Sequence, residues 1–112
     1  MSDPLPLTDL AFNILVALSN QDLHGYALVK QLRELDGREG LRTGTVYAAL
    51  ARLQDAGWVA DAEPPDHAVD SRRKYYRITS EGVVTARSEA ARLRTVLARA
   101  GKAALLQDAT GG

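Results

Sequence analysis

A short basic cluster is the part of this sequence whose residue types most directly indicate a ligand. Arg72, Arg73, Lys74 and Arg77 fall within six positions, with no acidic residue among them. Guanidinium and ammonium groups at this density bind phosphate groups through charge-assisted hydrogen bonds. The cluster therefore predicts a polyanionic partner, and the most common partner of such a positive stripe is a nucleic acid.

The charge of the whole chain is balanced, but it is not evenly mixed. The 112 residues carry 14 Lys and Arg against 14 Asp and Glu, a formal net charge of zero. The first 23 residues hold three aspartates and no basic residue, and residues 57–70 hold four acidic residues and no basic one. One surface can therefore be positive although the molecule is neutral.

Other kinds of site are disfavoured by what the sequence contains. It has no cysteine, which excludes disulfides and thiolate chemistry, and its two histidines, His24 and His67, stand alone. A metal sensor is therefore not expected. No Gly-rich loop is followed by Lys, and no Ser/His/Asp set falls at a plausible turn, so we predict neither an enzyme nor a cofactor.

The length and the apolar pattern predict a small cytoplasmic protein. With 112 residues and 46% hydrophobic residues, the chain has room for one modest core. Its first residues lack a basic leader region, and no apolar run approaches the length of a membrane span.

The helices and strands that position the basic cluster can be predicted from the spacing of the apolar residues. Thr8 can cap a first helix, whose apolar positions follow the helical period up to Leu18. A second helix should start near His24 and Gly25, with a buried stripe of Leu28, Val29, Leu32 and Leu35, and should end at Asp36-Gly37.

The third helix has clear signals at both ends. Thr43 or Thr45 can be its N-cap, and Gly57 stands where a C′ glycine belongs. The core stripe is expected to be Val46, Ala49, Leu50 and Leu53. Gly25 and Gly44 fit positions of helix entry or of close approach.

After Gly57 the period changes to that of two strands, residues 58–62 and 74–79, which form a hairpin around the loop 64–71. Alternation along the second strand directs one of Tyr75 and Tyr76 inward, and we expect Tyr76 and Ile78 to pack in the core. Trp58 should plug the core.

Thr79 or Ser80 then caps a long final helix. Its apolar residues recur at alternating spacings of three and four, the a/d pattern of a helix that packs on a partner helix. The first helix could be that partner, but a second copy of the chain suits the length better. The predicted dimer seam consists of Val83, Ala86, Ala90, Leu93, Leu97, Ala100 and Ala104.

The order of elements predicts a mainly α (α+β) winged helix-turn-helix. Residues 1–79 would form this domain, residues 80–106 the dimerisation helix and residues 107–112 a disordered tail. The third helix would enter a DNA major groove, and the hairpin would be the wing that follows the phosphates.

Several segments resemble the PadR-like transcriptional regulators, over a region from about Leu7 to Val96. The resemblance rests on residues 7–11, on His24-Gly25-Tyr26 and the residues to 32, on residues 44–53, on Gly57-Trp58-Val59, and on residues 73–79 with Glu81-Gly82. It implies a winged-helix dimer that binds an operator, often as a repressor, and a C-terminal helix that makes the dimer.

This sequence departs from the family pattern at two places. Ala48 stands where the family commonly has proline after the tyrosine of the recognition helix. Asp66 and Asp70 at the wing tip would repel phosphate. Only one helix follows the hairpin, as in the short branch of the family, so no effector site is carried over.

We therefore expect a homodimeric regulator that binds a pseudo-palindromic site in double-stranded DNA and acts as a repressor. Base-edge contacts are assigned to Thr45, Tyr47, Ala48 and Arg52. Phosphate contacts are assigned to Tyr26, Lys30, Arg42, Thr43, Arg72, Arg73 and Lys74. The rival hypothesis is a winged-helix protein-interaction module without DNA binding. The neutral net charge and the acidic wing would favour it.

Overall fold

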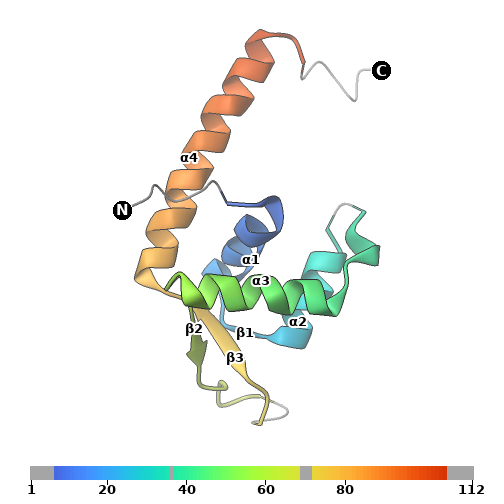
Figure 1. Ribbon diagram of the computed structural model, residues 1–112, viewed down its shortest axis with the longest axis vertical. Helices are drawn as coiled ribbons and strands as arrows, with labels where there is room; N and C mark the ends of the chain where they lie inside the picture. Colours follow the sequence, from blue (N-terminus) through green and yellow to red (C-terminus); the bar gives the residue numbers. More distant parts are fainter. Residues whose placement is uncertain (1–6, 36, 69–71, 106–112) are drawn as a thin grey trace.

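The computed structural model describes residues 7–35, 37–68 and 72–105 (Figure 1). They form α1 (Asp9–Asn20), β1 (Leu23–His24), α2 (Gly25–Arg33), the 3₁₀ helix η1 (Arg38–Gly40), α3 (Thr43–Asp55), β2 (Val59–Ala62), β3 (Tyr75–Ile78) and α4 (Ser80–Lys102). This order confirms the predicted mainly helical class with a hairpin wing and a long final helix. The proposed tail, residues 107–112, and Asp70 of the wing tip lie outside the described residues.

The first three helices and the sheet surround one apolar core. The predicted core stripe of α3 is confirmed, because Val46, Ala49, Leu50 and Leu53 are all buried. In α2 the stripe is confirmed except at Leu35, which is 44% exposed. That prediction was wrong because α2 ends at Arg33, so the helical period does not reach Leu35.

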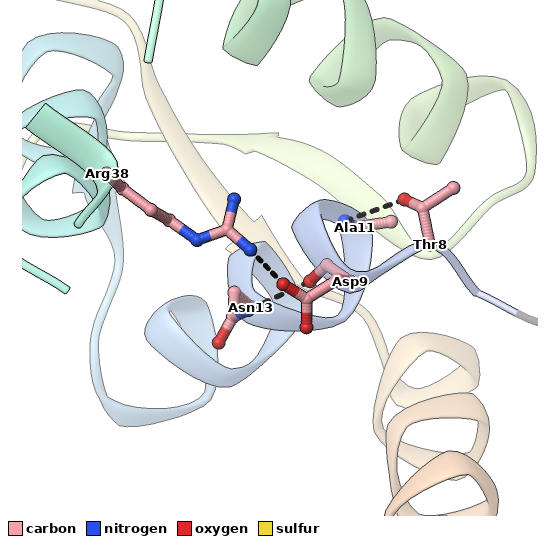
Figure 2. A network of polar contacts seen from close by, with 5 residues as sticks. All are labelled: Thr8, Asp9, Ala11, Asn13 and Arg38. Carbon is pink, nitrogen blue, oxygen red and sulfur yellow. Dashed lines mark hydrogen bonds and ion pairs between the residues drawn. The ribbon is translucent and has the colours of Figure 1, made fainter. Parts of the chain in front are cut away.

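The start of α1 is tied to the connection between α2 and α3. As predicted, Thr8 caps α1, and its Oγ1 accepts the backbone N–H of Ala11 at 3.0 Å. The Asn13 amide donates to the carbonyl oxygen of Asp9 at 2.9 Å. Figure 2 shows the Asp9 carboxylate paired with the guanidinium of Arg38 in η1. This ion pair links two segments that are 29 positions apart.

The two ends of α3 differ in how well the sequence predicted them. Its N-cap is Arg42, whose side chain makes no capping bond, so the prediction of Thr43 or Thr45 as the cap was wrong. Its C-terminal end is as predicted, since Gly57 adopts a left-handed φ of 82°. There the Gly57 N–H donates to Gln54 O and the Trp58 N–H to Leu53 O, both at 3.0 Å, which is a Schellman motif.

The sheet has a strand that the sequence did not predict. β3 lies between β2 and the two-residue strand β1, and both pairs are antiparallel. Leu23 pairs with Tyr76 and His24 with Tyr75, so the wing is joined to the segment that leads into α2. Tyr75 and Tyr76 are both buried, which corrects the expectation that only one would be. Tyr75 is covered because its ring meets the ring of His24 edge to face at 5.3 Å.

The long helix α4 starts on the sheet and then projects beyond the helical body (Figure 1). Thr79 is its N-cap; the Thr79 hydroxyl accepts the N–H of Gly82 at 3.0 Å and donates to Gly57 O at 2.7 Å. The helix ends at Lys102, four positions before the predicted end. Ala104 lies beyond it with a left-handed φ of 64°, so its assignment to the helical seam was wrong.

Candidate nucleic-acid interface

The outer face of α3 is exposed to solvent. Because the opposite face is packed in the core, Thr45, Ala48 and Arg52 are exposed together. These are three of the four residues to which the sequence analysis assigned base contacts. The small side chains near the N-terminal end allow close approach to a surface, and Arg52 adds a cation about two turns further on.

Arg33 fixes the turn that leads into α3, and the sequence analysis missed it. The Nε of Arg33 donates to Leu41 O at 2.8 Å, and its Nη2 donates to the hydroxyl of Thr43 at 3.3 Å. The side chain thus joins the last residue of α2 to the first residue of α3. A basic residue in the last turn of α2 was the available signal, but it did not identify the partner.

Tyr47, the fourth assigned base reader, leans from α3 toward the start of α2. A β-carbon on Gly25 would lie 2.5 Å from Cζ of Tyr47, so the ring can lie there only because residue 25 is glycine. The close approach predicted at Gly25 is therefore confirmed. At Gly44 it is not, because a β-carbon there would meet nothing within 4 Å.

Arg73 and Lys74, just before the second wing strand and here called the wing base, lie beside the contact between α2 and α3. Each of these cations packs against a tyrosine ring. The guanidinium of Arg73 is 5.7 Å from the ring centroid of Tyr26, and the ammonium of Lys74 is 5.5 Å from that of Tyr76. Both distances are within the range of cation–π attraction. Lys74 also pairs with the carboxylate of Asp61 at 3.3 Å. Asp61 in turn accepts a hydrogen bond from the side-chain amide of Gln54, the penultimate residue of α3, at 2.8 Å.

These side chains line one open cavity of about 460 Å³ between α2, α3 and the wing. Its walls are three tyrosines, two cations, a histidine and a glycine: Tyr26, Tyr47, Tyr76, Arg73, Lys74, His24 and Gly25. The predicted recognition helix and the predicted wing cations are therefore brought together at one surface. Cations and phenol groups side by side are what a phosphate-contacting face is expected to carry.

His24 lies at the centre of this arrangement. It caps α2, with its Nδ1 accepting the N–H of Ala27 at 3.1 Å. Burial, and then the charge of Arg73, lower the pKa of the imidazole below its usual value. Burial is also the main reason why the pKa of Tyr76 is raised, with Lys74 opposing the shift.

The remaining predicted phosphate contacts are exposed and surround this surface. Arg42, Thr43 and Arg72 are all exposed, and Lys30 lines a second open cavity of about 520 Å³ together with Tyr26, Arg33, Glu34 and Glu39. Within the described ranges, no three His, Asp or Glu side chains are grouped so that they could hold a metal ion. In the same part of the chain, no helix is both long and apolar enough to cross a membrane.

The predicted seam on α4 divides into two parts. Val83 and Ala86 are partly buried and, with Phe12 and Val16 of α1, line an apolar groove of about 400 Å³. Further along, Leu93 is 38% and Leu97 56% exposed. Val96, which was not predicted as part of the seam, is 38% exposed on the same stretch. The helix therefore packs on α1 at its start and has an uncovered apolar stretch where it leaves the body.

Glu89 of α4 is the one buried charged residue among the residues that the structure describes, and its charge is compensated. Its two carboxylate oxygens accept hydrogen bonds from Nε and Nη2 of Arg92 at 3.0 and 2.7 Å. This contact is the main reason why the pKa of Glu89 is lowered. The pair lies one turn before Leu93 and can remain intact beside an apolar contact.

Known proteins match both the sequence and the fold. The family model described as the transcriptional regulator PadR-like family matches residues 14–88. A PadR family transcription regulator from Clostridium difficile is 26% identical, with a TM-score of 0.75 over 85% of this chain and 97% of that one. None of the curated proteins matches the chain significantly.

Two further structures are similar in the same way. A PadR-like transcriptional regulator from Bacillus cereus is 25% identical, with a TM-score of 0.75 over 88% of this chain and 92% of that one. A structure described as a putative transcriptional regulator from Thermoplasma acidophilum is 25% identical, with a TM-score of 0.66 over 88% and 91% of the two chains.

Proposed function

This chain belongs to the PadR-like family of transcriptional regulators, and we propose that it binds a pseudo-palindromic operator in double-stranded DNA as a homodimer and represses transcription there. The observation that carries the proposal is the shared surface of α3 and the wing base. Tyr47 of α3 lines the same cavity as Arg73 and Lys74, so base-reading and phosphate-binding groups face one partner.

On this proposal the outer face of α3 enters the major groove, which is about 12 Å wide and admits one helix. Thr45 and Ala48 approach base edges or thymine methyl groups, and Arg52 reads a guanine. Tyr47 lies at the edge of this face, where its contact with Gly25 sets the spacing between α3 and α2.

The phosphates on either side are held by the groups around α3. Tyr26 of α2 lies beside Arg73 of the wing, Lys74 lines the same cavity, and Lys30 is one turn further along α2. Arg42, Thr43 and Arg72 complete the set. These contacts are independent of sequence and supply most of the salt-dependent affinity.

The dimer is proposed to form through the uncovered stretch of α4. Leu93, Val96 and Leu97 form an apolar stripe on a helix that projects from the body, and a second copy of α4 would remove it from water. Val83, Ala86, Ala90 and Ala100 would flank this contact. Two α3 helices about 34 Å apart would then fit successive major grooves. Because it acts on the chromosome, such a regulator works in the cytoplasm.

The phosphate assignment is tested by the salt dependence of DNA binding. We compare the wild type with the double variant Arg73→Ala/Lys74→Ala and with the control Arg99→Ala/Lys102→Ala in the last turn of α4. Loss of two phosphate contacts should reduce the slope of log K against log salt by about two and weaken specific and scrambled DNA alike. The control should leave the slope unchanged. An unchanged slope in the wing variant would contradict the assignment. Binding of a protein partner without any DNA binding would favour the interaction-module hypothesis instead.

A further inference from the structure

His24 contacts three elements that must keep their positions for the wing to work. It ends β1, where it pairs with Tyr75 of β3, and it is the N-cap of α2. Because Nδ1 accepts the N–H of Ala27 at 3.1 Å, the neutral ring carries its proton on Nε2. The ring also stacks nearly parallel to that of Tyr26, with an angle of 10° between the planes and 6.3 Å between centroids.

The wing cation Arg73 lies against this imidazole. Its Nη1 is 3.3 Å from Nδ1 and 3.5 Å from Nε2 of His24, although the two residues are 49 positions apart. The same guanidinium lies over the ring of Tyr26. Among the described residues, no carboxylate pairs with Arg73, whereas its neighbour Lys74 has Asp61. Arg73 is thus held by neutral partners, which leave its charge available to an anion.

We propose that His24 is a positioning residue, which in its neutral form holds the guanidinium of Arg73 on α2 where it can receive a DNA phosphate. The inference rests on the proposed function, because it explains how one of the proposed phosphate contacts is set in place. A preformed contact costs less conformational entropy on binding than one made by a mobile arginine.

Protonation of His24 would release Arg73. An imidazolium has no acceptor nitrogen, so the bond from Ala27 would be lost. The ring would then also carry a positive charge against the guanidinium of Arg73, which would be repelled from it. The other groups around the ring are Lys74 from the wing and the phenols of Tyr26, Tyr47 and Tyr75 from α2, α3 and β3. None of these described neighbours is an anion that could compensate the added charge. The lowered pKa of His24 agrees with this environment.

The contact itself can be tested without DNA. The protein has two histidines, so the ring signals of His24 can be followed by NMR with His67 as the internal reference. The Arg73→Ala variant should raise the pKa of His24, because it removes a positive charge that disfavours the imidazolium. The matched control is Arg77→Ala, which removes an exposed cation from the same wing strand and should leave the His24 titration unchanged. An unchanged titration in the Arg73 variant would overturn the proposal.

The role in DNA binding is tested by a pH profile of the Arg73 contribution. In the wild-type background, Arg73→Ala should weaken binding to upstream DNA about fivefold to tenfold near pH 8, and less than about twofold at a pH below the folded-state pKa of His24 that the NMR titration gives. The background variant His24→Asn keeps a capping side chain but cannot titrate. In it, the effect of Arg73→Ala should be small and equal at both pH values.

Two results would overturn this role: a wild-type effect that does not change with pH, or the same pH dependence in the His24→Asn background. Absence of DNA binding at both pH values would instead remove the proposed function and the phosphate role with it. The NMR titration would then still decide whether His24 holds Arg73.

Discussion

The phenol of Tyr47 occupies the space in which a β-carbon of residue 25 would lie. A β-carbon built on Gly25 would be 2.5 Å from Cζ and 2.8 Å from Cε1 of Tyr47, and closer still to the hydroxyl oxygen. Gly25, the first residue of α2, and Tyr47 of α3 are therefore in direct contact, which is possible because residue 25 has no side chain. This contact sets how closely α2 and α3 approach each other on the proposed DNA-binding side.

Replacing Gly25 with Ala should destabilise the protein. Alanine favours a helix by about 1 kcal/mol over glycine, but the added methyl group would displace Tyr47 at a cost of about 1–3 kcal/mol. Urea unfolding should therefore show a net loss of stability. The same change in a Tyr47→Ala background should cost less than about 0.5 kcal/mol, because the clash is gone.

Gly44→Ala is the matched control for this prediction. It also places a methyl group in the first turn of a helix, but that methyl would meet nothing within 4 Å. We expect this variant to be as stable as the wild type or more so. If Gly25→Ala and Gly44→Ala have the same stability, the contact with Tyr47 does not constrain residue 25.

The sequence predicted what has a period or a local signal, and it missed what depends on distant contacts. The core stripe of α3, the caps at Thr8 and Thr79 and the glycine at the end of α3 all leave such signals. β1 has only two residues, which is too short for any alternation to be visible. Its pairing with β3 is the reason that Tyr75 is buried.

The candidate site shows the same division. The residue types and their spacing along the sequence identified the exposed face of α3 and the basic cluster. They could not show that Arg73 lies on His24, that Asp61 pairs with Lys74 or that Arg33 holds the turn before α3, because each contact joins segments that only the fold brings together.

Stability should fall as the pH is lowered through the range in which His24 titrates. Since the folded state lowers the pKa of His24 below its ordinary value of 6.5, the unfolded chain binds this proton more readily. The stabilising effect is therefore fully present above about pH 6.5 and is lost as the pH falls through the folded pKa.

The measurement is the free energy of unfolding in urea between about pH 5 and pH 8, for the wild type and for His24→Asn. The variant keeps an N-cap but lacks the titrating group, so its stability should change less over this interval. Equal pH dependence in the two proteins would show that His24 is not responsible.

Removing the charge of Asp61 should strengthen DNA binding modestly. Its carboxylate holds Lys74 at 3.3 Å in an exposed pair, and such pairs contribute about 0.2–1 kcal/mol. Asp61→Asn keeps an oxygen that can accept from Gln54 but releases the lysine. We expect affinity for upstream DNA to rise about twofold to fourfold, as measured by fluorescence anisotropy.

The control for this variant is Glu63→Gln, which removes the next acidic charge along the wing. Both changes add one net positive charge, so any gain shared by the two is a general electrostatic effect. A gain specific to Asp61→Asn supports phosphate contact by Lys74, and equal gains in both variants would contradict it.

A charge in the proposed seam of α4 should dissociate the dimer. Leu97 is 56% exposed in the single chain, and its burial against a second copy would contribute about 1.5–3 kcal/mol. Leu97→Glu would lose this contribution and would bury a carboxylate without a partner. Sedimentation equilibrium should show a monomer at concentrations at which the wild type is a dimer.

Val84→Glu is the control for the seam. Val84 is 67% exposed and lies nine positions before Leu93, about two and a half turns, so it faces the opposite side of α4. This variant should remain dimeric. If the dimer persists in Leu97→Glu but dissociates in Val84→Glu, the seam lies on the face of α4 that carries Val84, and the proposed face is wrong.

Sequence-specific DNA binding by this protein is tested most directly with DNA from its own upstream region. The measurement is fluorescence-detected binding to that DNA and to scrambled DNA of equal length, each at a low and a high salt concentration. We expect a preference for the upstream DNA of about a thousandfold or more, with affinity that falls steeply as salt increases. Equal and weak binding to both DNAs would contradict sequence-specific binding.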